Sequence, residues 1–419
     1  VYGLWDDSGQ VGAAYADHAN TQLSSNINLT INGGGSGYGV YLPGRDATTY
    51  TTGNAFAAAA NATANSTIEI TNYAPTSAVG GVVAEVAGLV PGITEQGIAG
   101  YTFGYYGGAG INALSTAEGA NANGKVTVNQ YGNIYGMVAL VGIGAYATAG
   151  NAHSEITMNL YGNGIDGDET DVITGLMGNT TDRLAVGAVA AESANASSVI
   201  TLNVGDAQHT DFVGHVYGMY EAFGVANSGT GTASSEIYIN QYGTGTVIGI
   251  GEGMAIVNGN DTTTSLVDIN ILNNKNNADI YGIFDGSHVS SEGKGTINIT
   301  QNGAGTVYGM YAQKSSGDNN GTINIDIANS AHASTVYGIY ASGVSMSMRN
   351  STGVDDKGTI NIISNGLGSI YGAYSDNGAK IYNAGYNLAE GAINITVNNS
   401  ANNAAIYGLY NAVNSGGTN

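Results

Sequence analysis

Hydrophobic and polar positions alternate in a short phrase that recurs along the chain. In "GTINITQNGAGTVYGMYAQ", from Gly295, and "GTINIDIANSAHASTVYGIYAS", from Gly321, an alternating segment is followed by a polar turn and by apolar-Tyr-Gly-apolar-aromatic. Ile323 and Ile325 share one face and Asn324 points to the other, which is the period of a half-buried β-strand. The pattern therefore predicts two strands per repeat, one alternating and one built on Tyr-Gly.

Looser copies of the phrase run back to the start, which gives about eleven paired copies of about 34 residues. "VYGLW" (Val1 to Trp5) is a further second half, and "GIAGYTF" (Gly97 to Phe103) is a candidate for another. Similar aliphatic pairs mark the alternating strands: Ile27/Leu29, Ile68/Ile70, Val126/Val128, Ile237/Ile239, Val267/Ile269, Ile360/Ile362 and Ile393/Ile395. One repeat cannot bury so apolar a face alone, so successive repeats must stack.

The predicted fold is all-β: a right-handed parallel β-helix (β-solenoid) of about 12 three-sided coils, which forms a rod of about 60 Å. We expect a single continuous solenoid over residues 1–419. Its coils are looser over 1–150, carry loop insertions over 151–230, and form regular two-coil repeats over 235–419.

The Tyr-Gly step is predicted to be a corner of the coil, because both residues flanking the Tyr-Gly pair are apolar. A bend at the glycine would allow this. The glycines concerned are Gly218, Gly282, Gly309, Gly338, Gly372 and Gly408. The tyrosine and the later aromatic residue would then point outward in two rows. The alternative is that one tyrosine row points inward and packs the core.

In the last six copies, the spacing from the central strand residue to the Tyr-Gly glycine alternates between 11 residues, as from Asn298 to Gly309, and 14, as from Asn324 to Gly338. Alternate coils should therefore carry a turn that is three residues longer. Aligned in this way, four asparagines share one register and could form an amide ladder: Asn298, Asn324, Asn361 and Asn394. The polar side chains of this outer face either keep it hydrated and bond to one another, or they form a surface that contacts glycans or a neighbouring rod.

The charge balance excludes several classes of function. The net charge of −22, from 31 acidic residues against 9 Lys plus Arg, disfavours binding of nucleic acid. The absence of cysteine excludes disulfides, thiol catalysis and Cys-zinc sites. The most apolar stretch (Ala78 to Ile93) is interrupted by Glu85 and Pro91, so no membrane insertion is predicted.

The insertion "IDGDETD" gathers carboxylates at Asp166, Asp168, Glu169 and Asp171. Hard cations prefer several oxygen ligands from one loop, so the insertion is a candidate calcium site, although a solvated acidic loop is the simpler interpretation. No other cofactor is predicted.

A second insertion holds two histidines with two aspartates, Asp206, His209, Asp211 and His215, which could bind a metal or form part of the surface. An enzyme acting on polysaccharide is disfavoured, because the three arginines that could bind acidic sugars lie in different coils: Arg45, Arg183 and Arg349. We therefore expect a non-enzymatic protein.

The glycine- and asparagine-rich coils, the absence of cysteine, the acidic balance and the "GTINI...VYGIYA" style resemble β-helical passenger domains of bacterial autotransporters and related surface adhesins. The resemblance implies export to the bacterial cell surface or the extracellular space. It also implies roles that range from adhesion and self-association to toxin delivery.

The two ends of the sequence are complementary in phase: "VYGLW" begins within a coil and "SGGTN" (Ser415 to Asn419) stops about where another strand would begin. We therefore expect a self-associating structural protein in which solenoids stack end to end into filaments. The junction would involve Val1, Tyr2, Trp5, Tyr407 and Tyr410. The alternative function is an adhesin or toxin passenger that binds a host surface or glycan, and the alternative source of the phase match is excision from a longer solenoid.

Overall fold

The structure is a computed structural model of the 419-residue chain. It describes residues 2–5, 14–32, 37–42, 54–73, 79–84, 102–106, 111–132, 137–141, 143–162, 172–177, 186–210, 212, 214–220, 222–227, 230–252, 254–258, 264–274, 279–285, 294–313, 318–319, 322–329, 335–344, 346–350, 357–364, 368–379, 381–385, 392–399 and 405–410. These residues form strands and turns. They contain no helix, and therefore none long and apolar enough to cross a membrane.

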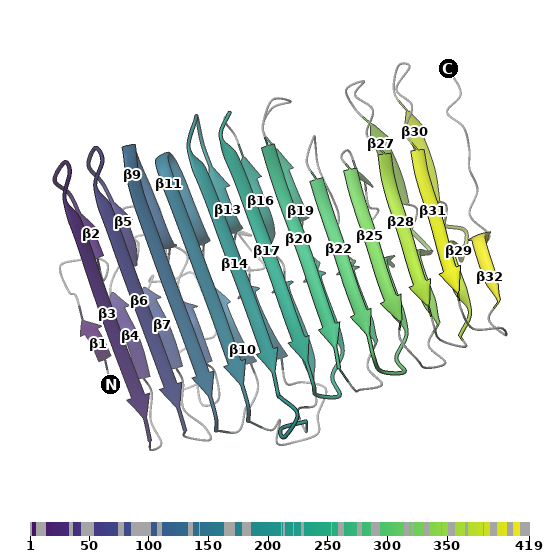
Figure 1. Cartoon of the computed structure of the whole chain (residues 1–419), viewed down its shortest axis with the longest axis horizontal. Helices are drawn as coiled ribbons and strands as arrows, with labels where there is room; N and C mark the ends of the chain where they lie inside the picture. Colours follow the sequence, from purple (N-terminus) through teal and green to yellow (C-terminus); the bar gives the residue numbers. More distant parts are fainter. Residues whose placement is uncertain are drawn as a thin grey trace.

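Every sheet is parallel, and strands from successive repeats lie side by side in chain order (Figure 1). The Tyr-Gly sheet has 13 strands. They are β1 (Tyr2–Trp5), β4 (Gly37–Leu42), β7 (Val79–Ala84), β8 (Thr102–Tyr106), β10 (Met137–Val141), β12 (Val172–Met177), β15 (His215–Tyr220), β18 (Val247–Gly251), β21 (Ile280–Phe284), β23 (Val307–Ala312), β26 (Val336–Ser342), β29 (Ile370–Asp376) and β32 (Ile406–Tyr410).

The long-strand sheet carries the alternating phrase. Its long strands are β3 (Gln22–Ile31), β6 (Thr63–Asn72), β9 (Ile111–Gln130), β11 (Ile143–Leu160), β14 (Asn195–Val204), β17 (Thr232–Gln241), β20 (Thr264–Asn273), β22 (Lys294–Gln301), β25 (Thr322–Asn329), β28 (Lys357–Ser364) and β31 (Ala392–Asn399). Short strands join it at one side: β2 (Ala14–Ala16), β5 (Ala55–Ala57), β13 (Val186–Ala190), β16 (Phe223–Asn227) and β19 (Met254–Asn258). A separate small sheet contains β24 (Asp318–Asn319), β27 (Met346–Asn350) and β30 (Ile381–Gly385).

The chain therefore forms a parallel β-solenoid, as the periodicity predicted. The last two residues of "GIAGYTF", Thr102 and Phe103, begin strand β8, which pairs with β7 and β10, and the rest of that segment lies outside the described residues. Strands β1 and β32 lie at opposite ends of the rod (Figure 1). The number of coils, about 12, and the right-handed sense stay predictions.

Where a short strand is described, the three strand segments of a coil form two layers. A Cβ built on Gly218 of the Tyr-Gly strand β15 would lie 2.4 Å from Ile237 on β17, and one built on Gly187 of the short strand β13 would lie 2.6 Å from the hydroxyl of Ser235 on β17. The Tyr-Gly and short strands thus both face the long strands. The coil is flattened and not triangular.

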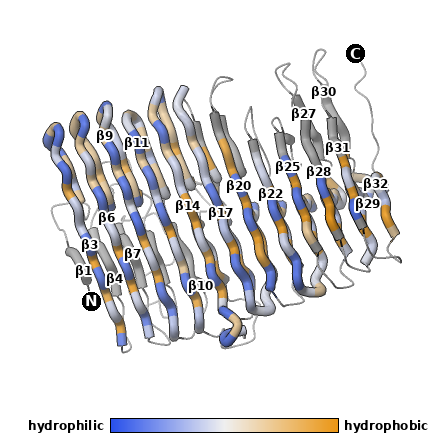
Figure 2. The backbone as a smooth tube through the Cα atoms, in the orientation of Figure 1, coloured by the Kyte–Doolittle hydropathy of each residue, from blue (hydrophilic) through white to orange (hydrophobic). Residues whose placement is uncertain are grey.

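Aliphatic side chains of the long strands fill the space between these layers. The inward assignment is confirmed wherever the side chains are described: Leu29, Ile68, Ile70, Val126, Val128, Ile237, Ile239, Val267, Ile269, Ile325 and Ile362 are buried, and Ile27 and Ile395 are partly buried. Apolar and polar residues alternate along the front strands in Figure 2. Each coil buries only one face, so its remaining stabilisation comes from pairing with the coils on either side.

The Tyr-Gly pair lies inside a strand, so the prediction of a corner there was wrong. Gly309 is within β23, and its backbone does not adopt the left-handed conformation. A Cβ at this position would lie 2.5 Å from the Gly338 carbonyl oxygen of the next coil and 2.5 Å from Cγ2 of Ile325 in the opposite layer. Glycine is required because the layers and coils approach each other here.

The strand register observed between successive coils of the two-coil repeat differs from the alignment predicted from the sequence. Ile297 pairs with Ile325, so Asn298 lies beside Asp326 and not beside Asn324. In the observed register, 11 residues separate Asn298 from Gly309 and 12 separate Asp326 from Gly338. Alternate turns therefore differ by one residue and not by three. A two-residue slip keeps the same side chains facing inward, so the alternation of the strand could not detect it.

Candidate functional site

A distinct surface feature is the pair of aromatic rows on the outer side of the Tyr-Gly sheet, which we name the aromatic face. Its first row contains Tyr281, Tyr308, Tyr337, Tyr371 and Tyr407, and its second row contains Phe284, Tyr311, Tyr340, Tyr374 and Tyr410. The residues that flank the rings along each strand, such as Val307 and Met310, are fully buried, whereas the rings are partly exposed. This confirms the outward orientation of both rows and excludes the inward alternative.

The rings form a herringbone. Consecutive rings of the first row stack with centroids 4.7–5.1 Å apart, and those of the second row with centroids 4.9–5.3 Å apart. The two rings of one coil meet edge to face, at interplanar angles of 72–86°. Each ring inside a row therefore has both faces covered by its neighbours, so the surface between the row ends presents ring edges and hydroxyl groups.

Two positions interrupt the rows at β18. Register places Ile248 between Tyr217 and Tyr281, and Gly251 between Tyr220 and Phe284. The position of the first row thus accepts isoleucine, and that of the second row accepts phenylalanine, without a change of fold.

Carboxylates lie beside the aromatic face and influence its hydroxyls. Tyr340 donates a hydrogen bond to Asp376 Oδ2 at 2.7 Å, whereas Tyr311 donates to the amide oxygen of Gln313 at 3.2 Å. Burial raises the pKa of Tyr340, and the hydrogen bond to Asp376 raises it further. Burial likewise raises the pKa of Tyr337 to about 12, with smaller contributions from Tyr371, Tyr374 and Asp376. These phenols remain protonated at neutral pH.

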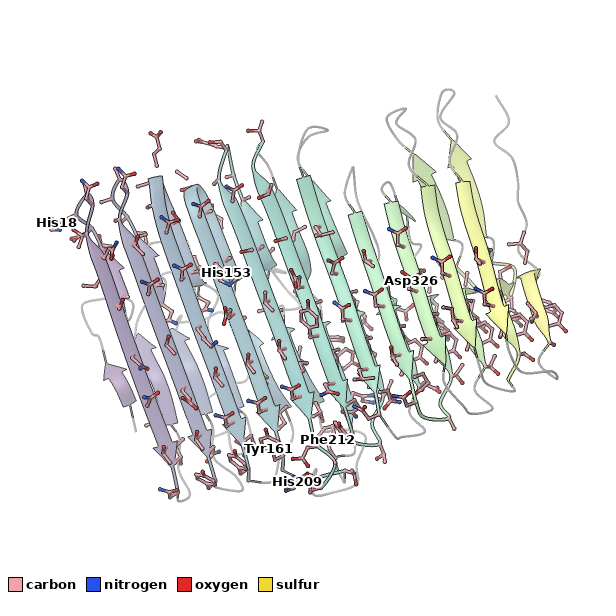
Figure 3. All side chains as sticks on the ribbon, in the orientation of Figure 1. His18, His153, Tyr161, His209, Phe212 and Asp326 are labelled. Atoms are coloured by element: carbon pink, nitrogen blue, oxygen red, sulfur yellow. The ribbon has the colours of Figure 1, made fainter. Side chains whose placement is uncertain are left out.

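The outer side of the long-strand sheet carries amide ladders. Asn151 donates to Asn121 at 2.9 Å, and Asn195 donates to Asn151 at 3.0 Å. A parallel ladder runs through Asn129, Asn159 and Asn203, each bond being 2.8 Å. The ladder predicted through Asn298, Asn324, Asn361 and Asn394 was wrong in register: Asn298 donates to Asn270 at 2.8 Å, and Asn361 donates to Asp326 at 2.9 Å. Asp326 lies midway along β25 (Figure 3).

No family model, curated protein or solved structure matches this chain. The surfaces of the rod are therefore the basis on which a function can be inferred.

A second cluster spans β9, β11 and β14. His153 Nδ1 is 2.7 Å from Ser197 Oγ, its Nε2 is 3.4 Å from Glu155 Oε1, and Lys125 Nζ is 2.8 Å from Glu155 Oε2 (Figure 3). The hydrogen bond from Lys125 lowers the pKa of Glu155. Serine, histidine and a carboxylate in this order are the parts of an acyl-transfer site.

Acyl transfer also needs hydrogen-bond donors for the developing oxyanion. Here the strands on both sides of Ser197 pair with β14 in continuous register, so the backbone N–H groups of this region belong to the sheet ladder. The cluster therefore links side chains of three neighbouring strands, and the backbone amides of this region are not free to act as oxyanion donors. No sequence signal marked it, because Lys125 lies 30 positions from Glu155 and Ser197 lies 44 positions from His153, and these pairs meet only through coil stacking.

The carboxylates of the calcium candidate (Asp166, Asp168, Glu169 and Asp171) lie outside the described residues, as do Val1 and Asp211. Among the described residues, no three His, Asp or Glu side chains converge as metal ligands. His209 bonds Asp206 at 2.9 Å and meets the edge of Tyr161 in the turn labelled in Figure 3, whereas His215 lies on β15 against Tyr217. The backbone N–H of Gln208 lowers the pKa of Asp206.

The proposed junction residues are positioned as follows. Tyr2 and Trp5 lie on β1, in register with Tyr38 and Tyr41 of β4. Tyr407 and Tyr410 are the last rings of the two rows, and each is 38% exposed. The sequence identified these four residues by phase, but the row geometry that connects them to the aromatic face required the structure.

Proposed function

We propose that this chain is a non-enzymatic structural rod of the bacterial exterior, which self-associates by end-to-end stacking of solenoids into filaments. The observation that carries this proposal is the apolar edge of β32. Ile406 is 49% exposed and Leu409 is 58% exposed, although their counterparts one coil earlier, Ile370 and Ala373, are fully buried. An uncovered strand edge with apolar side chains is a template for a further parallel strand.

Register supports a second copy as the partner of β32. The first aromatic row ends at Tyr407 and the second at Tyr410, while Tyr2 and Trp5 of β1 occupy the corresponding positions of their strand. Stacking of β1 on β32 would bring Tyr2 over Tyr407 and Trp5 over Tyr410, so both rows would continue across the junction.

The two ends of the rod carry unlike strands, β1 and β32, so a contact between β32 of one copy and β1 of the next is head to tail. Unlike ends that join without closing a ring give an open filament.

The test is electron microscopy and sedimentation of the purified chain over a range of concentrations. We expect particles that lengthen with concentration and repeat at about 60 Å along the filament. Single short rods at high concentration would contradict the proposal.

A variant sharpens this test. No atom lies within 4 Å of a Cβ built on Gly408, whereas a Cβ on Gly372 would lie 2.6 Å from the Gly408 carbonyl oxygen of the next coil. Gly408→Ala should therefore leave the rod folded and block the next coil. Tyr407→Phe, which keeps the ring, is the control and should assemble like the parent. Equal filament lengths for Gly408→Ala and the parent would show that this edge is not the junction.

The alternative is an adhesin or toxin passenger that binds a glycan or host surface, as the resemblance to autotransporter passengers implies. Sugar rings bind aromatic faces that lie open, and the rings of the aromatic face are covered within their rows. Binding on a glycan array by rods that stay monodisperse would nevertheless favour the adhesin.

A further inference from the structure

The aromatic face brings nine tyrosines and one phenylalanine into a single connected array. Every ring from Tyr281 to Tyr410 has its centroid within 5.3 Å of the next ring in its row. Edge-to-face contacts join the rows within each coil, as between Tyr337 and Tyr340 at 5.1 Å. A stack this close allows an electron to pass from ring to ring without an intervening cofactor.

We propose that the aromatic face is a redox-active tyrosine array, in which the electron deficiency left by a one-electron oxidant moves between stacked rings and comes to rest on Tyr340. This activity is independent of end-to-end stacking, because it needs only the rows within one rod. The chemical class of its reactant is a strong one-electron oxidant that acts at the surface.

The hydroxyl partner of Tyr340 distinguishes it from its neighbours. Oxidation of a phenol at neutral pH releases a proton with the electron, and it is easiest where a base is already in contact with the hydroxyl. Among the described hydroxyls of the aromatic face, that of Tyr340 is the one that donates to a carboxylate, Asp376, at 2.7 Å. The amide oxygen next to Tyr311 is a much weaker base than a carboxylate.

The step is balanced within the array. The oxidant takes one electron from a tyrosine of a row, and successive neighbours replace that electron until Tyr340 has supplied it. The O–H bond of Tyr340 then breaks, its proton forms a new O–H bond on Asp376 Oδ2, and a neutral tyrosyl radical remains. Reduction by any external electron donor reverses the transfer and returns the proton.

The raised pKa values of the array agree with this route. Burial holds the phenols protonated, so the more easily oxidised tyrosinate form is scarce at neutral pH. Oxidation therefore depends on a base within hydrogen-bond distance.

The chain contains a matched control outside the array. Tyr238 on β17 donates to Glu236 Oε2 at 2.7 Å, so it has the same kind of proton acceptor. It is 40% exposed, more than Tyr340, and no ring of the described residues packs against it. Direct oxidation from solvent should therefore favour Tyr238, and migration along the rows should favour Tyr340.

The experiment uses the folded chain with photogenerated tris(bipyridine)ruthenium(III) at low dose. Tyrosyl radicals are trapped with a small soluble phenol, and the adducts are mapped by peptide mass spectrometry. We expect severalfold more adduct at Tyr340 than at Tyr238. Adduct yields that simply follow exposure, with Tyr238 at least equal to Tyr340, would overturn the proposal.

Two variants separate the base from the relay. Asp376→Asn keeps the shape but removes the base, so the adduct at Tyr340 should fall to the level found at Tyr337. Replacement of Tyr308, Tyr311, Tyr337 and Tyr374 by Phe keeps the packing but removes the oxidisable rings, as the natural Phe284 shows to be compatible with the row. The adduct at Tyr340 should then fall to that of Tyr238, and an unchanged yield would exclude migration.

Discussion

The glycine of the Tyr-Gly step should tolerate no side chain inside the rod. In Gly309→Ala, the new methyl group would lie 2.5 Å from the Gly338 carbonyl oxygen and 2.5 Å from Ile325 Cγ2, about 1 Å inside ordinary contact distance on two sides. The carbonyl belongs to the neighbouring coil's backbone, and Ile325 is only 1% exposed, so neither can move away easily. Overpacking costs about 1–3 kcal/mol, and two fixed contacts favour a loss of about 3 kcal/mol.

The matched control is the same substitution in the same motif at Gly408, where no atom lies within 4 Å of the added Cβ. There the loss of backbone freedom in the unfolded chain should leave stability unchanged or raise it by about 0.4–1 kcal/mol. Both variants are compared with the parent by urea unfolding at a concentration too low for association. If Gly309→Ala and Gly408→Ala unfold at the same urea concentration, close approach is not the reason for glycine in this motif.

Three further predictions concern the core, the turns and the aromatic face. Ile325→Asp should lower the free energy of unfolding by about 4 kcal/mol, because it buries an unpaired charge. As a control, Ile363→Asp, on a side chain that is 53% exposed, should change the free energy of unfolding by no more than about 0.5 kcal/mol. Equal melting of the two variants would refute the inward assignment of Ile325. Gln301→Ala should cost about 1–3 kcal/mol in urea unfolding, because Asn273 donates to its buried amide oxygen at 2.6 Å and would lose that partner. The contribution of Tyr337 to the free energy of unfolding should be complete below pH 10 and decrease as the pH rises toward 12. The reason is that the folded rod keeps the Tyr337 proton, which the unfolded chain releases near the ordinary pKa of 10.0. Unfolding free energies that stay constant between about pH 9 and about pH 12 would contradict this.

Much of the fold could be predicted from alternation, because burial of one strand face leaves a period of two. Pairs such as Ile68 and Ile70 identified the strands and their inward side. The same period could not fix register, since a shift of two residues preserves it: Asn324 was aligned with Asn298, but lies beside Thr296 and Thr359. Only closure of each coil through its turn decides between these registers.

The candidate site was partly predictable. The outward tyrosines follow from their spacing around buried neighbours such as Val336 and Ile339. Their herringbone packing, and the contact of Tyr340 with Asp376 one coil away, depend on the register between coils. The role of the Tyr-Gly glycine was mistaken for a bend, because sequence cannot reveal how closely a neighbouring backbone approaches.

The alternation of turn lengths sets the unit by which such a rod can evolve. Twelve residues separate Asp326 from Gly338, and 11 separate Asn361 from Gly372 in the next coil, so unlike turns lie side by side in these regular repeats. A gene duplication or deletion of one coil would bring two like turns into contact. A change of two coils restores the original neighbours at every position and keeps both aromatic rows aligned. Recombination among the repeats should therefore be tolerated in pairs of coils, and natural length variants should differ by even numbers of them.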